Sequence, residues 1–432
     1  MSKPRVMISG AGIGGLTTAL TLNQLGIDCV LFEAAAGLKH DHMGLNLQPN
    51  AVRELYDLGF TAADLDAVGV PAREWALVGL NGNDIYAEPR GLEAGYNWPQ
   101  YAVQRCAFKK MLYDELVGRA GPEAVRFDAF VTGYKIEDDG SVTVQVEHDD
   151  GSVTEDHGTL LIAADGIYSS VRAQMYPDQA PVRYKNTLLY QGVTRAKPVR
   201  TGSSFVGLGT THLQIIMYPI SAPDQNGEAL INWYVVQRDV PAERVKSSRF
   251  RLASPDELAD QVQNFRYKWL DVPEMLSNAI GVHERPMYDR DPVESWVDGS
   301  VALLGDAAHP MIPSGSTGPS QAVMDARVLG AKILQYGATP AALAAYDDEL
   351  CEPVSKLVLR NRDDGPFALL DLVDERCGGN FDDIDDVISG AERLAFMARY
   401  KSAAGFAVKK LNSAAPTIML DGAQGATVVN MT

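Results

Sequence analysis

The sequence is short of cysteine and of basic residues, and it has no long apolar run. Its four cysteines form no Cys-x-x-Cys pair, and none lies beside a histidine at metal-ligand spacing, so we expect reduced thiols and no metal site. The 38 Lys and Arg against 56 Asp and Glu give a net charge of −18, which repels polyanions, so no nucleic-acid partner is expected. No apolar stretch reaches the ~18 residues of a membrane span, and no signal-peptide core follows Met1, so we expect a cytoplasmic protein without a membrane span.

What the chain does have is the length and composition of a large globular protein. Its 432 residues exceed the ~100–200 of one domain, so we expect two packed units or one large domain with an insertion. Apolar residues make up 46% and charged residues 22%, which is close to the globular average. A sizeable core is therefore expected.

A glycine motif near the N-terminus separates an expected strand from an expected helix. Residues 5–9 form a short apolar run, and residues 14–25 carry apolar side chains at helical spacing. Gly10 permits a tight turn, Gly12 lets backbone approach a pyrophosphate, and Gly15 lets the helix pack closely on a sheet. Since a helix N-terminus offers N–H groups to phosphates, the motif predicts a dinucleotide site.

Glu33 narrows the choice of dinucleotide. It ends a second apolar run, residues 28–33. A carboxylate at this place accepts hydrogen bonds from ribose hydroxyls and repels a 2′-phosphate, so we expect FAD or NAD. The alternative interpretation of the motif is a glycine-rich turn without a ligand.

Two aspartate–glycine motifs follow later in the chain. The first is Ala164-Asp165-Gly166, and the second begins with Gly305-Asp306 directly after a buried-strand run at 301–304. Because ligands of α/β folds bind beyond the carboxyl ends of the strands, the Asp306 carboxylate is expected at a ligand-binding edge. The alternative is that Asp306 caps the following turn.

The second of these motifs leads into a loop that opens a long expected helix. The loop contains Pro313, Gly315, Gly318 and Pro319. The glycines permit close approach to a ligand, and N–H groups at a helix N-terminus stabilise an anion such as a reduced flavin. Pro319 lacks an N–H and suits the first helical position. An ordinary helix start would explain Pro319 but not the number of glycines.

Together and in this order, the motifs resemble those of the FAD-dependent aromatic hydroxylases, over roughly the first 370 residues. These single-component monooxygenases include p-hydroxybenzoate hydroxylase, salicylate hydroxylase and the phenazine-carboxylate monooxygenases. The resemblance implies that FAD, NADH or NADPH, and O2 are used to hydroxylate an aromatic or N-heteroaromatic small molecule through a flavin C4a-hydroperoxide. We expect a monomer or a homodimer.

The resemblance also implies roles for individual residues. Asp306, after Gly305, matches the aspartate that accepts a hydrogen bond from the FAD ribityl chain. Asp165 and Gly166 match a motif that touches both FAD and the nicotinamide cofactor, and Arg105 matches an arginine that reaches the FAD pyrophosphate. Without the resemblance, Arg105 would be interpreted as a surface residue at a helix start.

The predicted fold is of the α/β class, a Rossmann-like FAD-binding domain with an inserted β-sheet substrate domain and a C-terminal helical segment. β-rich stretches between about 187 and 238 indicate the inserted sheet. The predicted bounds are 1–73, 101–182 and 285–370 for the FAD-binding domain, 74–100 and 183–284 for the substrate domain, and 371–432 for the C-terminal segment and tail.

The substrate pocket is expected between the inserted sheet and the flavin. Gln191, Tyr218 and Pro313 are assigned to the flavin and substrate environment. The candidate lining residues are Tyr190, Gln191, Met217, Tyr218, Pro219, Trp233 and Tyr234. An aromatic stripe of this kind is at least as often plain core.

Two positions depart from the family pattern. His42 stands where relatives commonly have a small residue, in a stretch that covers the flavin, and its ring either alters flavin movement or faces solvent. Gln191 stands where close relatives often have arginine, which indicates a neutral substrate.

Three alternative functions stay open. A flavin halogenase shares the fold, but the five tryptophans form no Trp-x-Trp pair of the halogenase type. A flavin-linked dehydrogenase or reductase is compatible with the motifs, which report FAD binding and not oxygen use. A catalytically silent flavin-binding protein is the third alternative, and the intact Glu33, Asp165 and Asp306 disfavour it.

Overall fold

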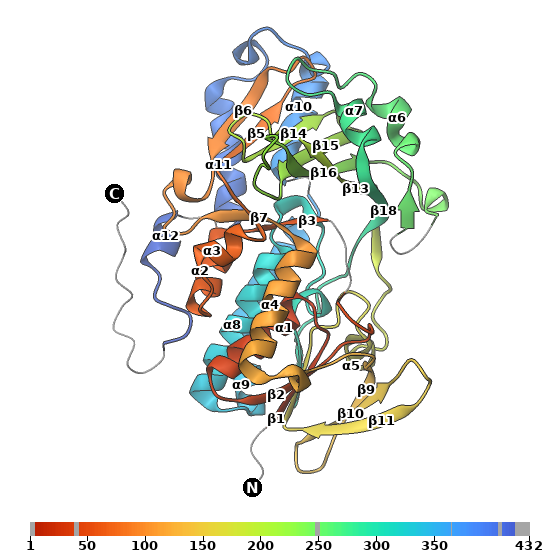
Figure 1. Ribbon diagram of the computed structural model, residues 1–432, viewed down its shortest axis with the longest axis vertical. Helices are drawn as coiled ribbons and strands as arrows, with labels where there is room; N and C mark the ends of the chain where they lie inside the picture. The colour runs from red at the N-terminus through yellow and green to blue at the C-terminus, as the bar shows by residue number, and fades with distance from the viewer. Residues whose placement is uncertain (1–4, 39–42, 247–250, 364, 405–407, 420–432) are drawn as a thin grey trace.

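The structure, a computed structural model, describes residues 5–38, 43–246, 251–363, 365–404 and 408–419. Two sheets organise it. A mostly parallel sheet with its helices occupies the lower part of Figure 1, and a larger, mainly antiparallel sheet occupies the upper part. The chain passes between these two parts several times.

The mostly parallel sheet is built from short apolar strands. In the described residues its strand order is β19-β20-β12-β1-β2-β8. The strand bounds are β1 Arg5–Ser9, β2 Asp28–Phe32, β8 Val125–Arg126, β12 Leu160–Ala163, β19 Val297–Asp298 and β20 Val301–Leu303. Only β19 runs antiparallel to its neighbour. The three glycine motifs therefore follow β1, β12 and β20 at one edge of the sheet.

Helix α1 (Ile13–Gln24) is covered on both sides, which is why it is apolar over most of its surface. It packs against α4 and α8, as Figure 1 shows. A Cβ on Gly330 of α8 would lie 2.2 Å from the Thr21 Cγ2 atom, so the two helices touch closely there. The other helix bounds in this part are α2 Pro49–Asp57, α3 Ala62–Asp66, α4 Arg105–Ala120, α5 Ser170–Met175, α8 Gly318–Tyr336 and α9 Pro340–Arg360.

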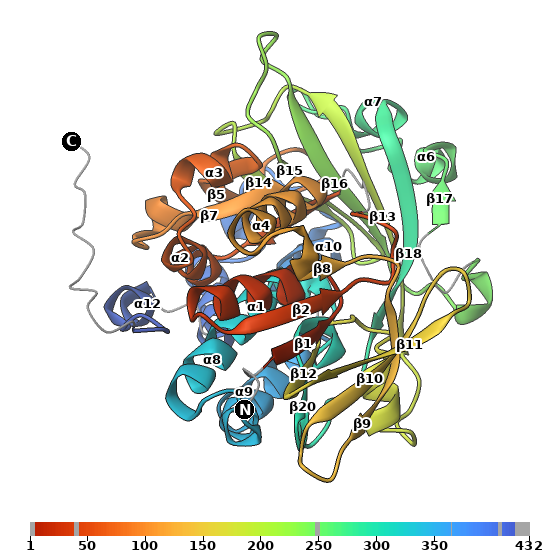
Figure 2. The same cartoon turned by 60° about the horizontal axis from the view of Figure 1, so that its bottom comes forward.

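The larger sheet is rich in β-branched and aromatic residues, which favour strands. Over the described part of the chain its order is β17-β18-β13-β16-β15-β14-β5-β6. The bounds are β5 Glu74–Val78, β6 Asp84–Pro89, β13 Arg183–Ala196, β14 Ser204–Gly209, β15 Leu213–Pro219, β16 Ala229–Gln237, β17 Arg251–Ala253 and β18 Ala279–Asp289. Figure 2 shows the long β13 and β18 side by side.

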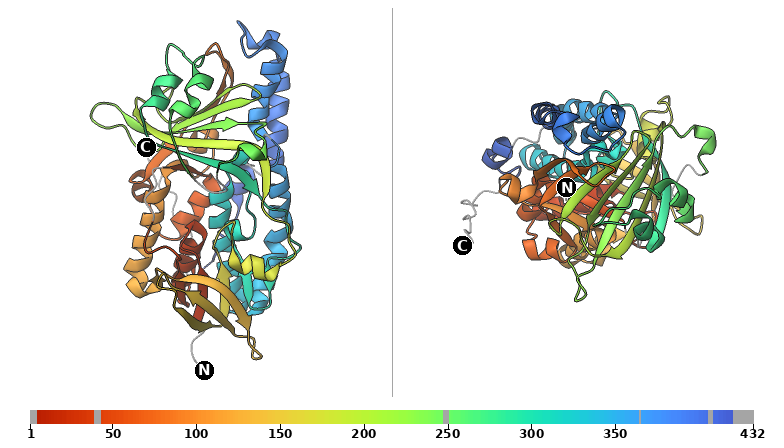
Figure 3. Two further views of the ribbon diagram at one scale, coloured as in Figure 1. Left: turned by 90° about the vertical axis from the view of Figure 1, so that its right-hand side faces the viewer. Right: turned by 90° about the horizontal axis from the view of Figure 1, so that it is seen from above.

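Each face of the larger sheet is covered by different helices. One face packs against α6 (Asp256–Val262) and α7 (Val272–Ser277) through a core that includes Trp233. The other face packs against α10 (Ala368–Cys377) and residues of α11 (Gly390–Ala404). Figure 3 shows the blue C-terminal helices and the green α6 and α7 on opposite sides of the sheet.

Two small sheets complete the fold. The sheet β3-β7-β4 lies between the two larger ones, with β3 Gly44–Leu47, β4 Gly69–Ala72 and β7 Gln100–Gln104. The sheet β11-β10-β9 flanks the parallel sheet, with β9 Phe130–Ile136, β10 Val142–Glu147 and β11 Val153–Gly158. A short helix, α12 (Val408–Ser413), follows α11.

The predicted α/β class, with a Rossmann-like unit, a second sheet and C-terminal helices, is confirmed. β5 and β6 join strands from 183 onward in one sheet, and β18 continues past residue 284 to Asp289. The domain bounds themselves stay a prediction. Within the described residues, no helix is both long enough and apolar enough to span a bilayer.

Candidate active site

The first glycine motif forms the turn between β1 and α1. Gly10 has a φ of +98°, and a Cβ there would lie 2.5 Å from the Ala164 carbonyl oxygen. A Cβ on Gly15 would lie 1.9 Å from the Gly10 carbonyl oxygen. At Gly12, by contrast, the nearest atom to a Cβ is the Ala164 carbonyl oxygen at 3.9 Å. Gly10 and Gly15 are thus required by the protein's own packing, whereas Gly12 faces open room.

Glu33 lies beside this turn, at the end of β2. Its Oε2 accepts a hydrogen bond from the Ala11 N–H (2.9 Å), and its Oε1 accepts one from the Ala35 N–H (3.0 Å). These bonds fix the carboxylate and leave it lone pairs for further donors. The arrangement fits the ribose of an adenine dinucleotide.

Asp165 follows β12, next to the same turn. The Ser170 N–H donates to its Oδ2 (3.1 Å), while its Oδ1 is buried and has no hydrogen-bond partner among the described residues. Burial raises the pKa of Asp165, and hydrogen bonds from Ser169 and nearby backbone lower it in part. A buried acceptor without a donor costs free energy, so the Asp165 Oδ1 atom suits a ligand that donates a hydrogen bond to it.

Asp306 is exposed and follows β20 across Gly305, whose φ is +61°. The short helix that begins at Gly305 has no side-chain cap, and no hydrogen bond involves the Asp306 carboxylate in the described part of the chain. The capping alternative is therefore not what the structure shows. An open carboxylate at this sheet edge fits a polyol chain such as the ribityl of FAD.

Asp325 on α8 is a site residue that the sequence interpretation missed. It is fully buried, its Oδ2 accepts a hydrogen bond from the Gly305 N–H (3.0 Å), and it pairs with the buried His309. Burial lowers the pKa of His309, but the charge and hydrogen bond of Asp325 raise it more, so the net pKa lies above its usual value. The pair holds the Gly305 loop in place. An aspartate within an apolar helix was the available signal.

The loop into α8 is tight and leaves its N-terminus open. Residues Pro313–Gly315 form a short 3-10 turn, and Ser316 has a φ of +50°. No described side chain caps α8 at Thr317, and a Cβ on Gly318 would meet nothing within 4 Å. N–H groups of the first turn are thus available to a negatively charged ligand.

Arg105 is exposed at the first position of α4, and its backbone N–H donates to the Met43 carbonyl oxygen (2.8 Å). This contact ties the start of α4 to the residue before β3. His42 lies outside the described residues, so its two interpretations are not resolved.

Gln191 belongs to a buried hydrogen-bond network that holds Gly44, the first residue of β3. Its Nε2 donates to Asn232 Oδ1 (3.0 Å) and to the Tyr234 hydroxyl (3.0 Å). The Gly44 N–H donates to Asn232 Oδ1 (2.7 Å), and the Tyr234 hydroxyl donates to the Gly44 carbonyl oxygen (3.0 Å). We call Gln191, Asn232, Tyr234 and Gly44 the Gly44 clasp. Asn232 was not predicted.

Tyr218 lies beside the clasp. Its ring stacks on Phe205 with centroids 4.0 Å apart, and its hydroxyl is 3.2 Å from that of Tyr234. Burial and the neighbouring Tyr234 raise the pKa of Tyr218 well above its usual value. It is therefore a neutral hydroxyl at physiological pH.

The expected pocket lining is partly wrong. Gln191, Tyr218 and Tyr234 lie on the sheet face toward β3, as the clasp requires. Successive residues of a strand point to opposite faces. The neighbours Tyr190, Met217 and Trp233 accordingly pack in the core under α6 and α7, and Pro219 pairs with Ile231 of that same core. These four residues are removed from the candidate lining.

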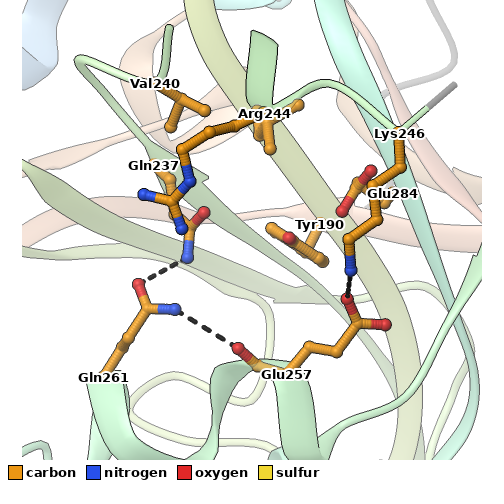
Figure 4. A pocket seen from close by; sticks show the side chains of 9 residues that line it. Tyr190, Gln237, Val240, Arg244, Lys246, Glu257, Gln261 and Glu284 are labelled. Atoms are coloured by element: carbon orange, nitrogen blue, oxygen red, sulfur yellow. Dashed lines mark hydrogen bonds and ion pairs between the residues drawn. The ribbon is translucent and has the colours of Figure 1, made fainter. Parts of the chain in front are cut away.

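A cavity of about 270 Å³ lies on this opposite face, against β13, β16, β18 and α6 (Figure 4). It is strongly polar, and Lys246 pairs with Glu257 (2.8 Å) at its edge. It is separated from the glycine motifs by the sheet, so it is not part of the dinucleotide site. Its lining residues are Leu188, Tyr190, Gln237, Val240, Arg244, Lys246, Glu257, Gln261 and Glu284.

Across the described residues, no group of three or more His, Cys, Asp and Glu is placed to hold a metal ion. The four cysteines are free thiols, and Cys351 is buried.

Comparison with known proteins agrees with the geometry. The sequence matches the FAD binding domain family over residues 3–362. It is 35% identical over 365 residues to a phenazine 1,6-dicarboxylic acid hydroxylase of Lysobacter antibioticus, covering 83% of this chain and 89% of that one. It is 28% identical over 375 residues to the FAD-dependent urate hydroxylase of Klebsiella pneumoniae, covering 83% and 88%.

Solved structures show the same fold. Klebsiella pneumoniae HpxO in complex with FAD and uric acid superposes with a TM-score of 0.72 at 25% identity, covering 94% of this chain and 96% of that one. A salicylate hydroxylase substrate complex gives a TM-score of 0.70 at 22% identity, covering 98% and 100%. The chain belongs to the FAD binding domain family and, within it, to the FAD-dependent aromatic hydroxylases.

Proposed function

We propose that the protein uses NADH or NADPH and O2 to hydroxylate an aromatic or N-heteroaromatic small molecule. The observation that carries this proposal is the convergence of Gly12, Glu33, Asp165 and Asp306 at the carboxyl ends of neighbouring strands, facing a sheet clasped onto β3. When bound, FAD supplies the electron transfer and the oxygen activation. The names of the relatives, which act on a phenazine dicarboxylic acid and on urate, support the ring-shaped substrate.

The first proposed task of the protein is to hold the cofactor. The α1 N-terminus at Gly12 would bind the pyrophosphate, with Arg105 at its side, and Glu33 would accept hydrogen bonds from the ribose. Asp306 would accept a hydrogen bond from the ribityl chain, and the buried Asp165 Oδ1 would take a donor near Gly166. Gly10, Gly15 and Gly305 give the backbone the turns that these contacts need.

The second task is to stabilise negative charge and exclude water. N–H groups at the start of α8, with Gly315 and Gly318 beside them, would stabilise the anion of the reduced ring, and Pro313 would pack against it. The Gly44 clasp would close the sheet over the ring edge. Because water in such a site diverts oxygen transfer to peroxide release, a tight clasp favours coupling.

The proposal is tested by NADH and NADPH oxidation with FAD-loaded protein and a panel of aromatic acids, phenols and N-heteroaromatic compounds, with products analysed by mass. We expect at least one compound to accelerate NAD(P)H loss and to gain one oxygen atom, and reactions without FAD to give neither. NAD(P)H consumption without an oxygenated product from any compound would favour the reductase alternative. A chlorinated product formed only with chloride present would favour the halogenase. FAD binding with neither NAD(P)H consumption nor a product would favour the silent flavin-binding protein.

A further inference from the structure

Arg285 lies on the sheet face that carries the Gly44 clasp. In the antiparallel pair of β13 and β18, Leu189 stands opposite Arg285 and Gln191 opposite His283. Residues directly opposite each other point to the same face, and the next residue points to the other. Arg285 therefore shares the face of Gln191, whereas its neighbour Glu284 pairs with Tyr190 on the face of α6.

The Arg285 guanidinium interacts electrostatically with groups of the larger sheet and of the cofactor motifs. Burial lowers its pKa, the hydroxyl of Tyr234 raises it, Arg105 lowers it, and Asp306 and Tyr218 raise it. Two tyrosines of the larger sheet and two charged residues of the cofactor motifs thus act on one cation. Arg285 is itself partly accessible.

Other buried arginines of the protein serve different purposes. Arg172 donates to the backbone carbonyl oxygens of Ala307, Ala308 and Asp291. Arg327 pairs with Glu54 between α8 and α2. Both are held by groups that lie outside the strands of the larger sheet.

The position of Arg285 bears on the substrate charge that was inferred from the sequence. Gln191, in place of an arginine, indicated a site without positive charge and hence a neutral substrate. The structure shows that Gln191 is engaged in the clasp and that a guanidinium stands on the adjacent strand of the same face. The positive charge that is missing at Gln191 of β13 is therefore present on the neighbouring strand, at Arg285 of β18.

We propose that Arg285 is the specificity-determining residue that binds an anionic group, a ring carboxylate, of the aromatic substrate. This inference rests on the proposed function. A guanidinium presents two parallel N–H donors that match a carboxylate, and in a partly desolvated site the pair discriminates strongly against an uncharged group. Tyr234 and Tyr218 beside it offer neutral hydroxyls for the ring.

The test compares matched acids and amides. FAD-loaded wild-type protein and Arg285→Gln are titrated with phenazine-1,6-dicarboxylate and 3-hydroxybenzoate and with the corresponding amides, and Kd is read from the flavin absorbance. We expect wild type to bind at least one acid more tightly than its amide. Arg285→Gln should weaken that acid roughly 10- to 100-fold, as for other hydrogen bonds to charged groups, and leave the amide unchanged.

Two further variants make the outcome decisive. Arg183→Gln, on the exposed start of β13, is the matched control and should leave both affinities as in wild type. Arg285→Lys keeps the charge and loses the paired donors, so acid binding should weaken less than in Arg285→Gln. Arg285→Lys carries the test if Arg285→Gln does not fold. Wild-type acid affinity in Arg285→Lys together with unchanged acid-to-amide ratio in Arg285→Gln would overturn the proposal, and so would the lack of any acid preference in wild type.

The experiment also separates this inference from the proposed function. FAD content is measured in each variant without substrate, and Arg285→Gln should keep its FAD. Loss of FAD with an unchanged acid-to-amide ratio would assign Arg285 to the cofactor and overturn the inference. Loss of acid preference in Arg285→Gln, with no oxygenated product from wild type, would sustain the inference and refute the hydroxylase proposal. Oxygenation of neutral compounds alone would sustain the hydroxylase proposal and overturn the inference about Arg285.

Discussion

Gly12 and Gly15, two glycines of the first motif, differ in the space that a side chain would have. A side chain at Gly15 would collide with backbone at 1.9 Å, but at Gly12 it would have 3.9 Å of room. Protein packing alone explains Gly15. Packing does not explain Gly12, which supports the proposal that a ligand approaches the backbone there.

This difference predicts that one alanine substitution lowers stability and the other lowers FAD affinity. Gly15→Ala should destabilise the FAD-free protein by about 1–3 kcal/mol, because backbone must shift to admit the methyl group. Gly12→Ala should change the unfolding free energy of the FAD-free protein by less than about 0.5 kcal/mol and weaken FAD binding roughly tenfold or more. Denaturant unfolding without FAD and fluorescence titration with FAD measure the two effects. Equal FAD affinity in Gly12→Ala and wild type would contradict the assignment.

His309 and Asp325 give the protein a pH dependence at the residue scale. The folded state raises the pKa of His309 above its usual value, because Asp325 outweighs burial. The resulting stabilisation is complete below the unfolded pKa of about 6.5 and is lost as pH rises through the raised folded pKa, with a slope of at most about 1.4 kcal/mol per pH unit.

We therefore expect the unfolding free energy to fall with rising pH above about 6.5, and this fall to be absent in Asp325→Asn. Denaturant unfolding across the pH range measures it. His212→Gln is the matched control, because His212 pairs with Asp239 on the exposed surface. The same slope in Asp325→Asn as in wild type would show that another group causes it.

At the scale of elements, the Gly44 clasp joins β3 to β13 and β16. Both polar backbone atoms of Gly44 are bonded to side chains of the larger sheet. β3 precedes α2 and also contacts α8, where the Gln48 N–H donates to Ser320 Oγ (2.9 Å). The clasp therefore links the larger sheet to α8, the helix whose N-terminus is expected to face the flavin ring.

Breaking the clasp should loosen this link. Asn232→Ala removes the acceptor of the buried Gly44 N–H, which costs about 1–3 kcal/mol of stability. We expect faster amide exchange at Gly44 and more NADH consumed per product molecule, measured by hydrogen exchange and by product yield. Asn226→Ala, in the exposed β15–β16 loop, should alter neither. If Asn232→Ala consumed no more NADH per product molecule than wild type, the clasp would not be needed to exclude water.

The elements also show what the sequence could predict. The turns at Gly10, Gly305 and Gly318 could be predicted, because each depends on a few consecutive residues after a strand. The clasp could not, since Gln191 and Gly44 are 147 residues apart and meet only through strand register. The wrong lining residues have a related cause. β13 is buried on both faces from Thr187 to Thr194, so its apolar pattern does not say which face meets the flavin.

At the scale of the whole molecule, the C-terminal segment packs on the larger sheet. Leu369, Leu370 and Val373 of α10 are buried against the sheet face that carries Tyr218. Arg238, the residue after β16, pairs with Asp371 (2.8 Å), and the Thr211 N–H donates to Asp374 (2.9 Å). Residues after 370, to which the sequence assigned no function, thus cover part of the sheet face that also carries the Gly44 clasp.

Because α10 packs on the larger sheet, we expect it to be needed for the stability of that sheet. Val373→Asp places a charge in a fully buried position and should lower the unfolding free energy by about 3 kcal/mol or more. Leu394→Asp is the matched control on α11, where the side chain is 62% exposed, and should change it little. Thermal and denaturant unfolding of the full chain measure both. Equal stability of the two variants would contradict the role given to this segment.

The proposed function requires the protein to place an aromatic substrate against FAD so that one atom of O2 enters the ring. The most direct measurement is the mass of the product formed by FAD-loaded protein and NADH or NADPH under isotopically labelled O2 in unlabelled water, with the compound that most accelerates NAD(P)H loss. The account predicts one labelled oxygen atom in the organic product. An oxygen taken from water, or NAD(P)H consumed with no oxygen in the product, would contradict it.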